Sequence, residues 1–331
     1  MKKIKINPIL ISCAIITLFT FAVSLNQSTL EKYTNNFNII KAILMAEYGI
    51  YFDEATNTQE LLETSSESSF LPIITQSEPS ELDVEEIVEN LHINDQTSKY
   101  YDLTDMLSNP INLGIIRHTE EPEILIVHTH GTESYSNDEN YDYEATVDRR
   151  STDKDVSIAK IASLLAENLN EMGITSIYCD EYHDYPEYNG SYDRSLESIE
   201  SYLEQYPSIK MVIDVHRDAI IGLNDQHTYT TVDIDGQECA QIMMVIGTNA
   251  GGLEHDNWQD NLNNAVNLQT YINQVDDGLM KDINLRESRF NQHATSGSML
   301  IEVGTSGNTL TQAINAIEVF SQDLAEYLLM Y

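Results

Sequence analysis

The sequence predicts an α/β fold with a mostly parallel central sheet and helices on both of its faces, preceded by one transmembrane helix and a flexible tether. Short apolar runs rich in β-branched residues alternate along the chain with longer segments whose apolar residues recur at helical spacing. This alternation is typical of parallel strands connected by helices. The anchor is predicted from a basic start followed by a long apolar segment, and the tether from the polar, acidic stretch behind it.

Residues 1–25 are predicted to form a cytoplasmic tip and a transmembrane anchor. Three lysines, Lys2, Lys3 and Lys5, precede an apolar segment over residues 8–25 that is long enough to cross a bilayer. The basic flank keeps the amino terminus in the cytoplasm, so the rest of the chain is expected on the outer side of the membrane. No Ala-x-Ala cleavage site follows, which favours a retained anchor over a removed signal peptide. We therefore expect a single-pass protein of the cytoplasmic membrane with an extracytoplasmic domain.

Residues 26–105 are predicted to connect the anchor to an ordered body. Apolar residues at helical spacing over 39–45 predict a short juxtamembrane helix, which Gly49 ends. Residues 53–95 are acidic, rich in Ser and Thr and interrupted by two prolines. Such a composition buries too little apolar surface to offset the entropy of ordering, so we expect a flexible tether there. The ordered body is expected over residues 106–331.

The first half of the body is predicted to alternate strands and helices. A short apolar run after Pro122 predicts a buried strand, and the helix that follows is expected to end at Gly173. A second helix is expected to stop before Pro207, and the apolar run behind it predicts another buried strand. In order, we expect a strand at 124–127, a helix at 155–172, a strand at 174–179, a helix at 194–205 and a strand at 210–215.

The second half is predicted to begin with a hairpin whose limbs are residues 228–235 and 240–247, with Gly236 in the turn. The second limb is apolar over residues 242–246, which predicts a central strand. Apolar residues at helical spacing predict the two remaining helices, the last with a single apolar stripe. The remaining expected elements are a helix at 258–275, a strand at 298–303 and a helix at 310–329.

The charge of the chain excludes one class of partner, and its cysteines are few. The formal net charge is −37 and the isoelectric point is about 4.2. Nucleic acid is therefore excluded as a natural partner, because binding to phosphates requires clustered Lys and Arg. Outside the apolar segment the chain has Cys179 and Cys239, which we interpret as small buried apolar residues.

Three predicted strands end in polar residues that can bind a metal or transfer a proton. The first leads into His128 and His130, the second into His216-Arg217-Asp218, and the last contains Glu302. Carboxyl ends of neighbouring parallel strands meet at one edge of a sheet. We therefore expect these clusters to lie together.

His130, Glu133 and His216 offer two imidazoles and a carboxylate, the ligand set of hydrolytic zinc sites with a fourth position left for water. Two nitrogen donors favour Zn²⁺ over magnesium or calcium. The alternative interpretation is that these residues only form hydrogen bonds with polar groups at the ends of buried strands. The other histidines of the body's loops, His183, His227, His255 and His293, are expected to lie on the surface or behind the ligands.

Glu302 is the candidate general base. A carboxylate inside an apolar strand is costly unless it is paired or functional. Near a metal it can accept a proton from water that attacks a carbonyl, and return it to the leaving amine. Arg217 is the second catalytic candidate, because its guanidinium can polarise the carbonyl or hold a substrate carboxylate. Asp218 is expected to orient His216, and a local ion pair of Asp218 with Arg217 is the alternative.

Several ordered motifs resemble one family. Together they resemble stage II sporulation protein P, a family of membrane-anchored peptidoglycan hydrolases of endospore-forming bacteria, over residues 123–331. The motifs are His128-Thr-His-Gly-Thr-Glu-Ser-Tyr135, Thr152-Asp-Lys-Asp-Val156, residues 183–192 with Arg194-Ser195, Ile213-Asp-Val-His-Arg-Asp218, Phe290-Asn-Gln-His293 and Leu300-Ile-Glu-Val-Gly304.

The resemblance implies a zinc-dependent N-acetylmuramoyl-L-alanine amidase fold, with an additional endopeptidase activity on peptide crosslinks, acting in forespore engulfment. It places the catalytic domain in the intermembrane space of the sporulating cell. It also implies two partners, the lytic transglycosylase stage II sporulation protein D and the membrane protein stage II sporulation protein M.

The resemblance leaves the third metal ligand open. The histidines of the wider amidase family correspond to His130 and His216, and the glutamate of its Val-Glu-x-Gly stretch corresponds to Glu302. Those amidases take their third ligand from the start of the first helix, where this chain has Asp153. Glu133 instead resembles the His-x-x-Glu pairing of zinc carboxypeptidases. We favour Glu133 and keep Asp153 as the alternative third ligand.

Two other functions are alternatives to this interpretation. A carboxypeptidase that trims stem peptides would need the same four residues. A wall-binding scaffold without enzymatic activity would not need the complete set.

Overall fold

The computed structural model describes residues 81–141, 143, 149–220 and 227–330. The predicted anchor, the juxtamembrane helix and most of the predicted tether lie outside these residues. None of the helices in the described part of the chain is long and apolar enough to cross a membrane.

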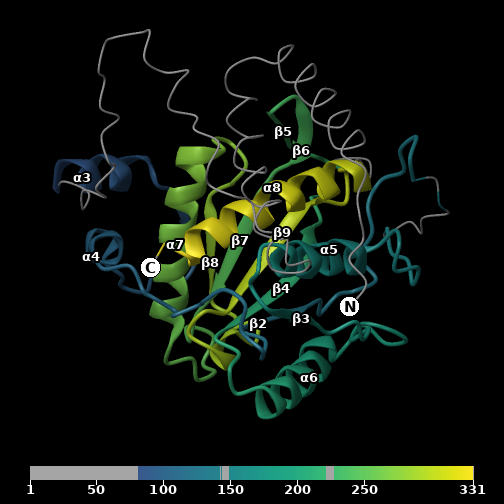
Figure 1. The fold of residues 1–331 in the computed structure, drawn as a ribbon, viewed down its shortest axis with the longest axis horizontal. Helices are drawn as coiled ribbons and strands as arrows, with labels where there is room; N and C mark the ends of the chain where they lie inside the picture. Colours follow the sequence, from purple (N-terminus) through teal and green to yellow (C-terminus); the bar gives the residue numbers. More distant parts are fainter. Residues whose placement is uncertain (1–80, 142, 144–148, 221–226, 331) are drawn as a thin grey trace, which may run out of the picture. The chain divides into compact units, whose positions relative to one another are not determined.

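A seven-stranded sheet forms the centre of the described chain, with the strand order β1-β8-β7-β9-β4-β2-β3 (Figure 1). The four strands β9, β4, β2 and β3 are parallel to one another, and so are β7, β8 and β1. The predicted mostly parallel sheet is therefore confirmed. The strands are β1 (Ile93–Asp95), β2 (Ile124–Val127), β3 (Ser176–Tyr178), β4 (Met211–Asp218), β7 (Ile242–Gly247), β8 (Ile283–Arg286) and β9 (Met299–Thr305).

The two parallel sets meet at an antiparallel junction between β7 and β9. The chain enters β7 from a hairpin, β5 (Thr231–Ile234) and β6 (Gln237–Ala240), and not from a crossover helix. Parallel neighbours require such a crossover, so the direction of β7 is free to reverse. Asp235 and Gly236 turn the hairpin with φ of 52° and 83°, as a two-residue turn requires. Our prediction that 240–247 is the second limb of this hairpin was wrong, whereas its apolar part is a central strand as expected.

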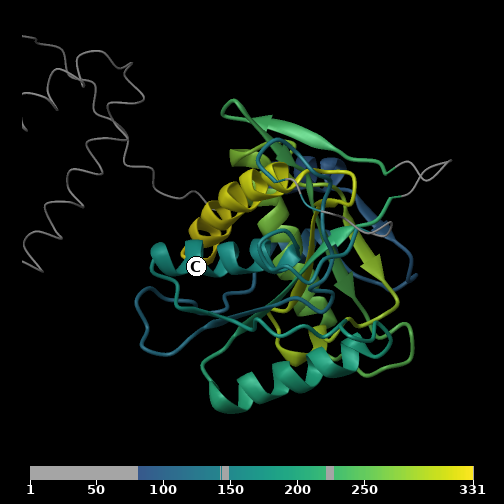
Figure 2. The same ribbon diagram turned by 90° about the vertical axis from the view of Figure 1, so that its right-hand side faces the viewer.

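Helices cover both faces of the sheet, as predicted. On one face, α5 (Ile158–Glu171), α7 (Trp258–Val275) and α8 (Leu310–Leu328) bury the main core. On the other face, α6 (Ser191–Gln205) packs over a smaller cluster. Figure 2 shows α6 and α8 on opposite sides of the sheet.

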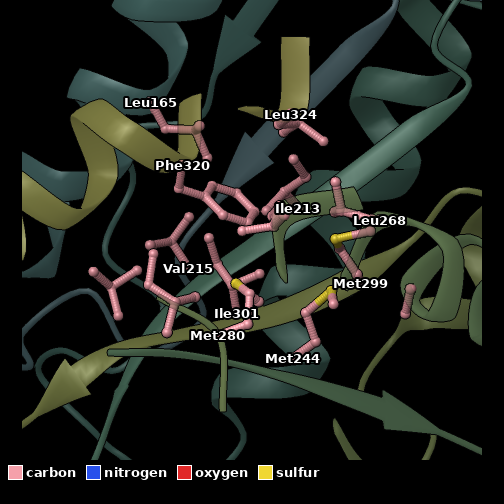
Figure 3. Close-up of a cluster of buried hydrophobic side chains, with 14 of the residues drawn as sticks. Leu165, Ile213, Val215, Met244, Leu268, Met280, Met299, Ile301, Phe320 and Leu324 are labelled. Carbon is pink, nitrogen blue, oxygen red and sulfur yellow. The ribbon is translucent and has the colours of Figure 1, made fainter. Parts of the chain in front are cut away.

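The alternation of side chains along the strands fills both cores. Ile124 and Ile126 of β2 face the main core, whereas Leu125 and Val127 face α6. In the main core, side chains from the middle of the sheet lie against α5, α7 and α8 (Figure 3). The labelled residues of this cluster are Leu165, Ile213, Val215, Met244, Leu268, Met280, Met299, Ile301, Phe320 and Leu324.

The ordered part of the chain begins earlier than we expected. Residues predicted as tether form α3 (Glu81–Asn90) and strand β1, which pairs with β8, and α4 (Leu103–Ser108) follows. Asn263 and Asn267 of α7 donate hydrogen bonds to the carbonyl of Met106 in α4. These contacts come from residues far along the chain. They order a segment whose acidic composition had predicted a flexible tether. Strand β8 and the 3₁₀ turn η3 (Gln292–Ala294) were also not predicted.

The sheet brings the three polar clusters to one edge. β4 lies between β2 and β9, and His216 is the register partner of Glu302. Cys179 and Cys239 are both buried and unpaired, as expected. The edge formed by the carboxyl ends of β2, β4 and β9 is where the candidate site lies.

Candidate metal centre

His130, Glu133 and His216 converge at the carboxyl edge of the sheet. Potential donor atoms of the three side chains all lie within 4.8 Å of one another. His130 and Glu133 come from the loop after β2, and His216 is in β4. Within the described residues, no other group of three or more His, Cys, Asp and Glu side chains is arranged in this way.

A tight turn directs His130 and Glu133 to the same side. The amide of Glu133 donates a hydrogen bond to the carbonyl of His130, 3.0 Å away. Gly131 occupies the turn because a Cβ atom there would lie 2.3 Å from Nδ1 of His128. The turn therefore needs glycine between the two ligands for steric reasons.

The distances suit a small cation. Nδ1 of His130 lies 3.8 Å from Oε1 of Glu133, and Nδ1 of His216 lies 3.7 Å from Oε2. Ligands of a tetrahedral zinc ion are about 3.4 Å apart, because each lies about 2.0–2.1 Å from the metal. Small side-chain rotations therefore close the group around an ion.

Asp214 supports His216 from behind. Its Oδ1 lies 3.0 Å from Nε2 of His216, in an ion-pair contact too bent to count as a hydrogen bond. The same carboxylate accepts hydrogen bonds from the amide (2.8 Å) and hydroxyl (2.6 Å) of Thr129. We had expected Asp218 to orient His216. A register shift between His216 and Asp218 separates them, and Asp218 accepts from the amide of Ala219 instead.

The electrostatics favour a bound cation. Burial alone would raise the pKa of Glu133, but the close contact with His216 and the charge of Arg217 hold it well below its usual range. Burial and the charge of His216 lower the pKa of His130 to about 4, so this imidazole is neutral and free to bind a metal. Burial opposes protonation of His216, yet the carboxylates of Asp214 and Glu133 raise its pKa well above the ordinary value. A cation is therefore stabilised between the carboxylates.

Glu302 lies next to this group on β9. Its Oε2 is buried and has no hydrogen-bond partner among the described residues. Burial, and then the negative charge of Glu133, raise the pKa of Glu302 well above its usual range. A carboxyl in this environment holds a proton more readily than an exposed one, as a group that accepts and returns a proton must do.

Arg217 lies beside Glu133 and bonds to the backbone. Its Nε and Nη2 donate to the carbonyls of Ser134 and Arg149, each at 3.0 Å, and its amide donates to Oε2 of Glu133 at 3.3 Å. The guanidinium thus fixes the loop that carries Glu133. Its predicted contact with substrate stays a prediction.

Asp153 does not join the group. Its side chain is exposed in the loop before α5 and accepts a hydrogen bond from the amide of Asp155. The other histidines also lie apart from it. His183 and His255 are buried and not on the surface, and His183 bonds to the carbonyl of His128 and to Ser198, which fits the supporting position that we allowed for it.

Two tyrosines that sequence reasoning missed flank His130. The ring of Tyr188 stacks on it with a centroid distance of 4.7 Å, and Tyr192 meets it edge-on at 5.5 Å. Tyr192 also lies parallel to the ring of His216, at 6.4 Å. The guanidinium of Arg150 lies over the ring of Tyr188, 4.7 Å from its centroid. In the sequence, the only indication of these rings was that both belong to residues 183–192, one of the motifs of the family resemblance.

A cavity of about 880 Å³ opens beside Glu133. Its size is in the range of sites for substantial organic ligands. It combines both signs of charge with exposed aromatic rings. Its lining includes Thr132, Glu133, Arg150, Asp184, Tyr185, Tyr188, Arg217, His227 and Ser306.

The sequence matches one family description over most of its length. The family model described as stage II sporulation protein P (SpoIIP) matches residues 24–325. None of the curated proteins compared with the chain matches it.

Solved structures resemble the chain at low identity. The CwlD amidase from Clostridioides difficile, in complex with the GerS lipoprotein, is 14% identical, with 63% of this chain and 100% of that chain covered and a TM-score of 0.40. The N-acetylmuramoyl-L-alanine amidase AmiC2 of Nostoc punctiforme is 14% identical, with 63% and 95% covered and a TM-score of 0.36. The N-acetylmuramyl-L-alanine amidase Ami1 from Mycobacterium smegmatis is 10% identical, with 65% and 100% covered and a TM-score of 0.37.

Proposed function

Since the chain belongs to the stage II sporulation protein P family, we propose that it is a zinc-dependent hydrolase of peptidoglycan that acts during sporulation. The bond that we assign to it is the amide between the lactyl group of N-acetylmuramic acid and L-alanine. Endopeptidase activity on peptide crosslinks and a role in forespore engulfment are the further activities that we propose for it.

The convergence of His130, Glu133 and His216 carries this proposal. The set fits zinc because it offers two imidazoles and one carboxylate, and because Asp214 supports one imidazole as outer carboxylates support metal-bound histidines. When bound, the metal supplies a positive charge that polarises the amide carbonyl and acidifies water. Glu133 is the third ligand in this proposal, and Asp153 is its alternative.

The chain's own residues move the protons. We assign to Glu302 the removal of a proton from the attacking water and its transfer to the leaving nitrogen. The C–N bond of the amide breaks, a C–O bond forms, and the products are a carboxylic acid and the free amine of the stem peptide. The raised pKa of Glu302 supports this assignment. We assign to Arg217, which lines the cavity beside Glu133, a contact with a polar group of the substrate.

The proposed location is the outer face of the cytoplasmic membrane. The basic start and apolar segment of residues 1–25 support an anchor there, with the catalytic domain in the intermembrane space of the sporulating cell. Protease added to protoplasts should then digest the domain, and complete protection would refute the orientation. On the family resemblance we propose two partners, the lytic transglycosylase stage II sporulation protein D and the membrane protein stage II sporulation protein M.

Digestion of purified muropeptides by the zinc-loaded extracytoplasmic chain tests the activity. We expect intact free stem peptides to be released, and chelation of the metal to abolish their release. Release of terminal amino acids alone would identify a carboxypeptidase. A protein that purifies without zinc, shows no thermal shift with zinc and cuts nothing would be a wall-binding scaffold.

A further inference from the structure

The first turn of α6 brings an aromatic ring to the metal centre. The ring of Tyr192 lies edge-on to His130 at 5.5 Å and parallel to His216 at 6.4 Å, with an interplanar angle of 12° for the second pair. Phe290 packs on Tyr192 with a centroid distance of 5.9 Å. One phenol ring is thus in contact with both of the histidines that we assign to the metal.

The Tyr192 hydroxyl is an available donor. Within the described residues it has no hydrogen-bond partner, although the charges of Asp214, Glu302 and Glu133 all act on it. A tyrosine hydroxyl carries its proton at neutral pH, so the group is a neutral O–H donor. By contrast, the nearby guanidinium of Arg217 already donates to two backbone carbonyls.

The backbone of Tyr192 is held in place. Asn291 donates from Nδ2 to the carbonyl of Tyr192 at 2.8 Å and to the hydroxyl oxygen of Ser195 at 3.0 Å. Ser195 lies 2.8 Å from the hydroxyl of Thr129, which itself bonds to Asp214. The segment before α6 is held as well, because Arg194 donates to the carbonyls of His183 (2.6 Å) and Asn189 (3.1 Å).

Hydrolysis of an amide is faster with such a donor beside the metal. As water adds to the carbonyl carbon, negative charge develops on the carbonyl oxygen. A fixed donor that reaches this oxygen lowers the barrier because no reorganisation is needed during the reaction. We propose that the Tyr192 hydroxyl donates a hydrogen bond to the carbonyl oxygen of the scissile amide as that oxygen becomes tetrahedral. Tyr192 keeps its proton throughout, and the proton balance of water, Glu302 and leaving amine is unchanged.

This inference rests on the proposed amide hydrolysis and makes Tyr192 a catalytic residue of it. Tyr192→Phe tests it, because phenylalanine keeps the ring packing against both histidines and removes only the hydroxyl. We expect kcat to fall by about 10²-fold, the effect of removing one such donor, with KM and zinc affinity near those of the unaltered protein. Affinity for a phosphinic analogue of the muramyl-L-alanine amide, which imitates the tetrahedral carbon, should fall by a similar factor.

Tyr206→Phe is the matched control. Tyr206 lies just past the other end of α6, about 20 Å from Tyr192 at the helical rise per residue, and its hydroxyl contacts Gln205. This variant should leave kcat and analogue affinity unchanged. If the unaltered zinc-loaded protein releases no stem peptide, the proposed function fails. If it does, and Tyr192→Phe keeps both its kcat and its analogue affinity, or loses zinc together with activity, the role assigned to the hydroxyl is wrong.

Discussion

Replacing Asp214 by Asn tests how the metal centre is built. The carboxylate of Asp214 lies 3.0 Å from Nε2 of His216 and accepts two hydrogen bonds from Thr129. Asparagine keeps the shape but has one acceptor oxygen in place of two. Its NH₂ must therefore face either the donors of Thr129 or the imidazole, and the negative charge that supports the ring is lost.

Loss of an outer carboxylate of this kind typically costs 10–100-fold in metal affinity, or about 1.4–2.7 kcal/mol. We expect the upper part of this range because Asp214 is 4% exposed, so water does not replace the missing interaction. Competition with a chromophoric chelator measures the zinc affinity directly. The melting temperature of the metal-free variant, compared with that of the metal-free parent, shows separately whether the fold has been weakened.

Asp218→Asn is the matched control for this measurement. Asp218 lies on the same strand two residues beyond His216, but its side chain accepts from the amide of Ala219. We expect its removal to leave zinc affinity within about twofold of the parent, since no ligand depends on it. Equal zinc affinity of Asp214→Asn and the parent protein, or an equal loss in both variants, would refute the role assigned to Asp214.

Two further predictions concern the metal centre, and a third concerns Asp323, a buried carboxyl of α8. Glu133→Ala should abolish zinc binding in equilibrium dialysis while Asp153→Ala keeps it, and the reverse pattern would assign the ligand to Asp153. Glu302→Gln should keep its zinc, measured by elemental analysis, and lose about 10²–10⁴-fold in turnover, whereas loss of zinc would make Glu302 a ligand. Burial, and then the charge of Asp276, raise the pKa of Asp323 to about 8. The native state therefore binds this proton more tightly than the unfolded chain, and stability should fall as pH rises from about 4 to 8. Asp323→Asn should raise the melting temperature at pH 8 by a few degrees and flatten this dependence, and a lower melting temperature would contradict it.

The sequence was sufficient to predict the residues that end buried strands. His216 and Glu302 interrupt apolar runs whose β character is plain, and His130 follows another such run, so their strands and their common edge could be predicted. The supporting carboxylate was assigned to the wrong residue. Asp214 and Asp218 are both two residues from His216, and only the register shift in β4 decides between them.

Contacts between distant segments account for the rest. The direction of β7 depends on how the β5–β6 hairpin leads into it, which no local pattern encodes. Strand β1 forms only because β8 is there to pair with it. Tyr188 reaches His130 from the segment before α6, which hydrogen bonds from Arg194 hold, and Tyr192 reaches it from the first turn of α6. The spacing of side chains along the sequence therefore does not predict that these two rings lie beside His130.

The central claim is that His130, Glu133 and His216 bind one zinc ion beside Glu302. A crystal structure of the protein soaked in zinc, with anomalous data collected on both sides of the zinc edge, tests it most directly. We predict a single strong anomalous peak within about 2.0–2.2 Å of Nδ1 of His130, a carboxylate oxygen of Glu133 and Nδ1 of His216, with Glu302 outside the ligand set. A peak bound by Asp153 in place of Glu133, or no peak at this edge of the sheet, would contradict the account.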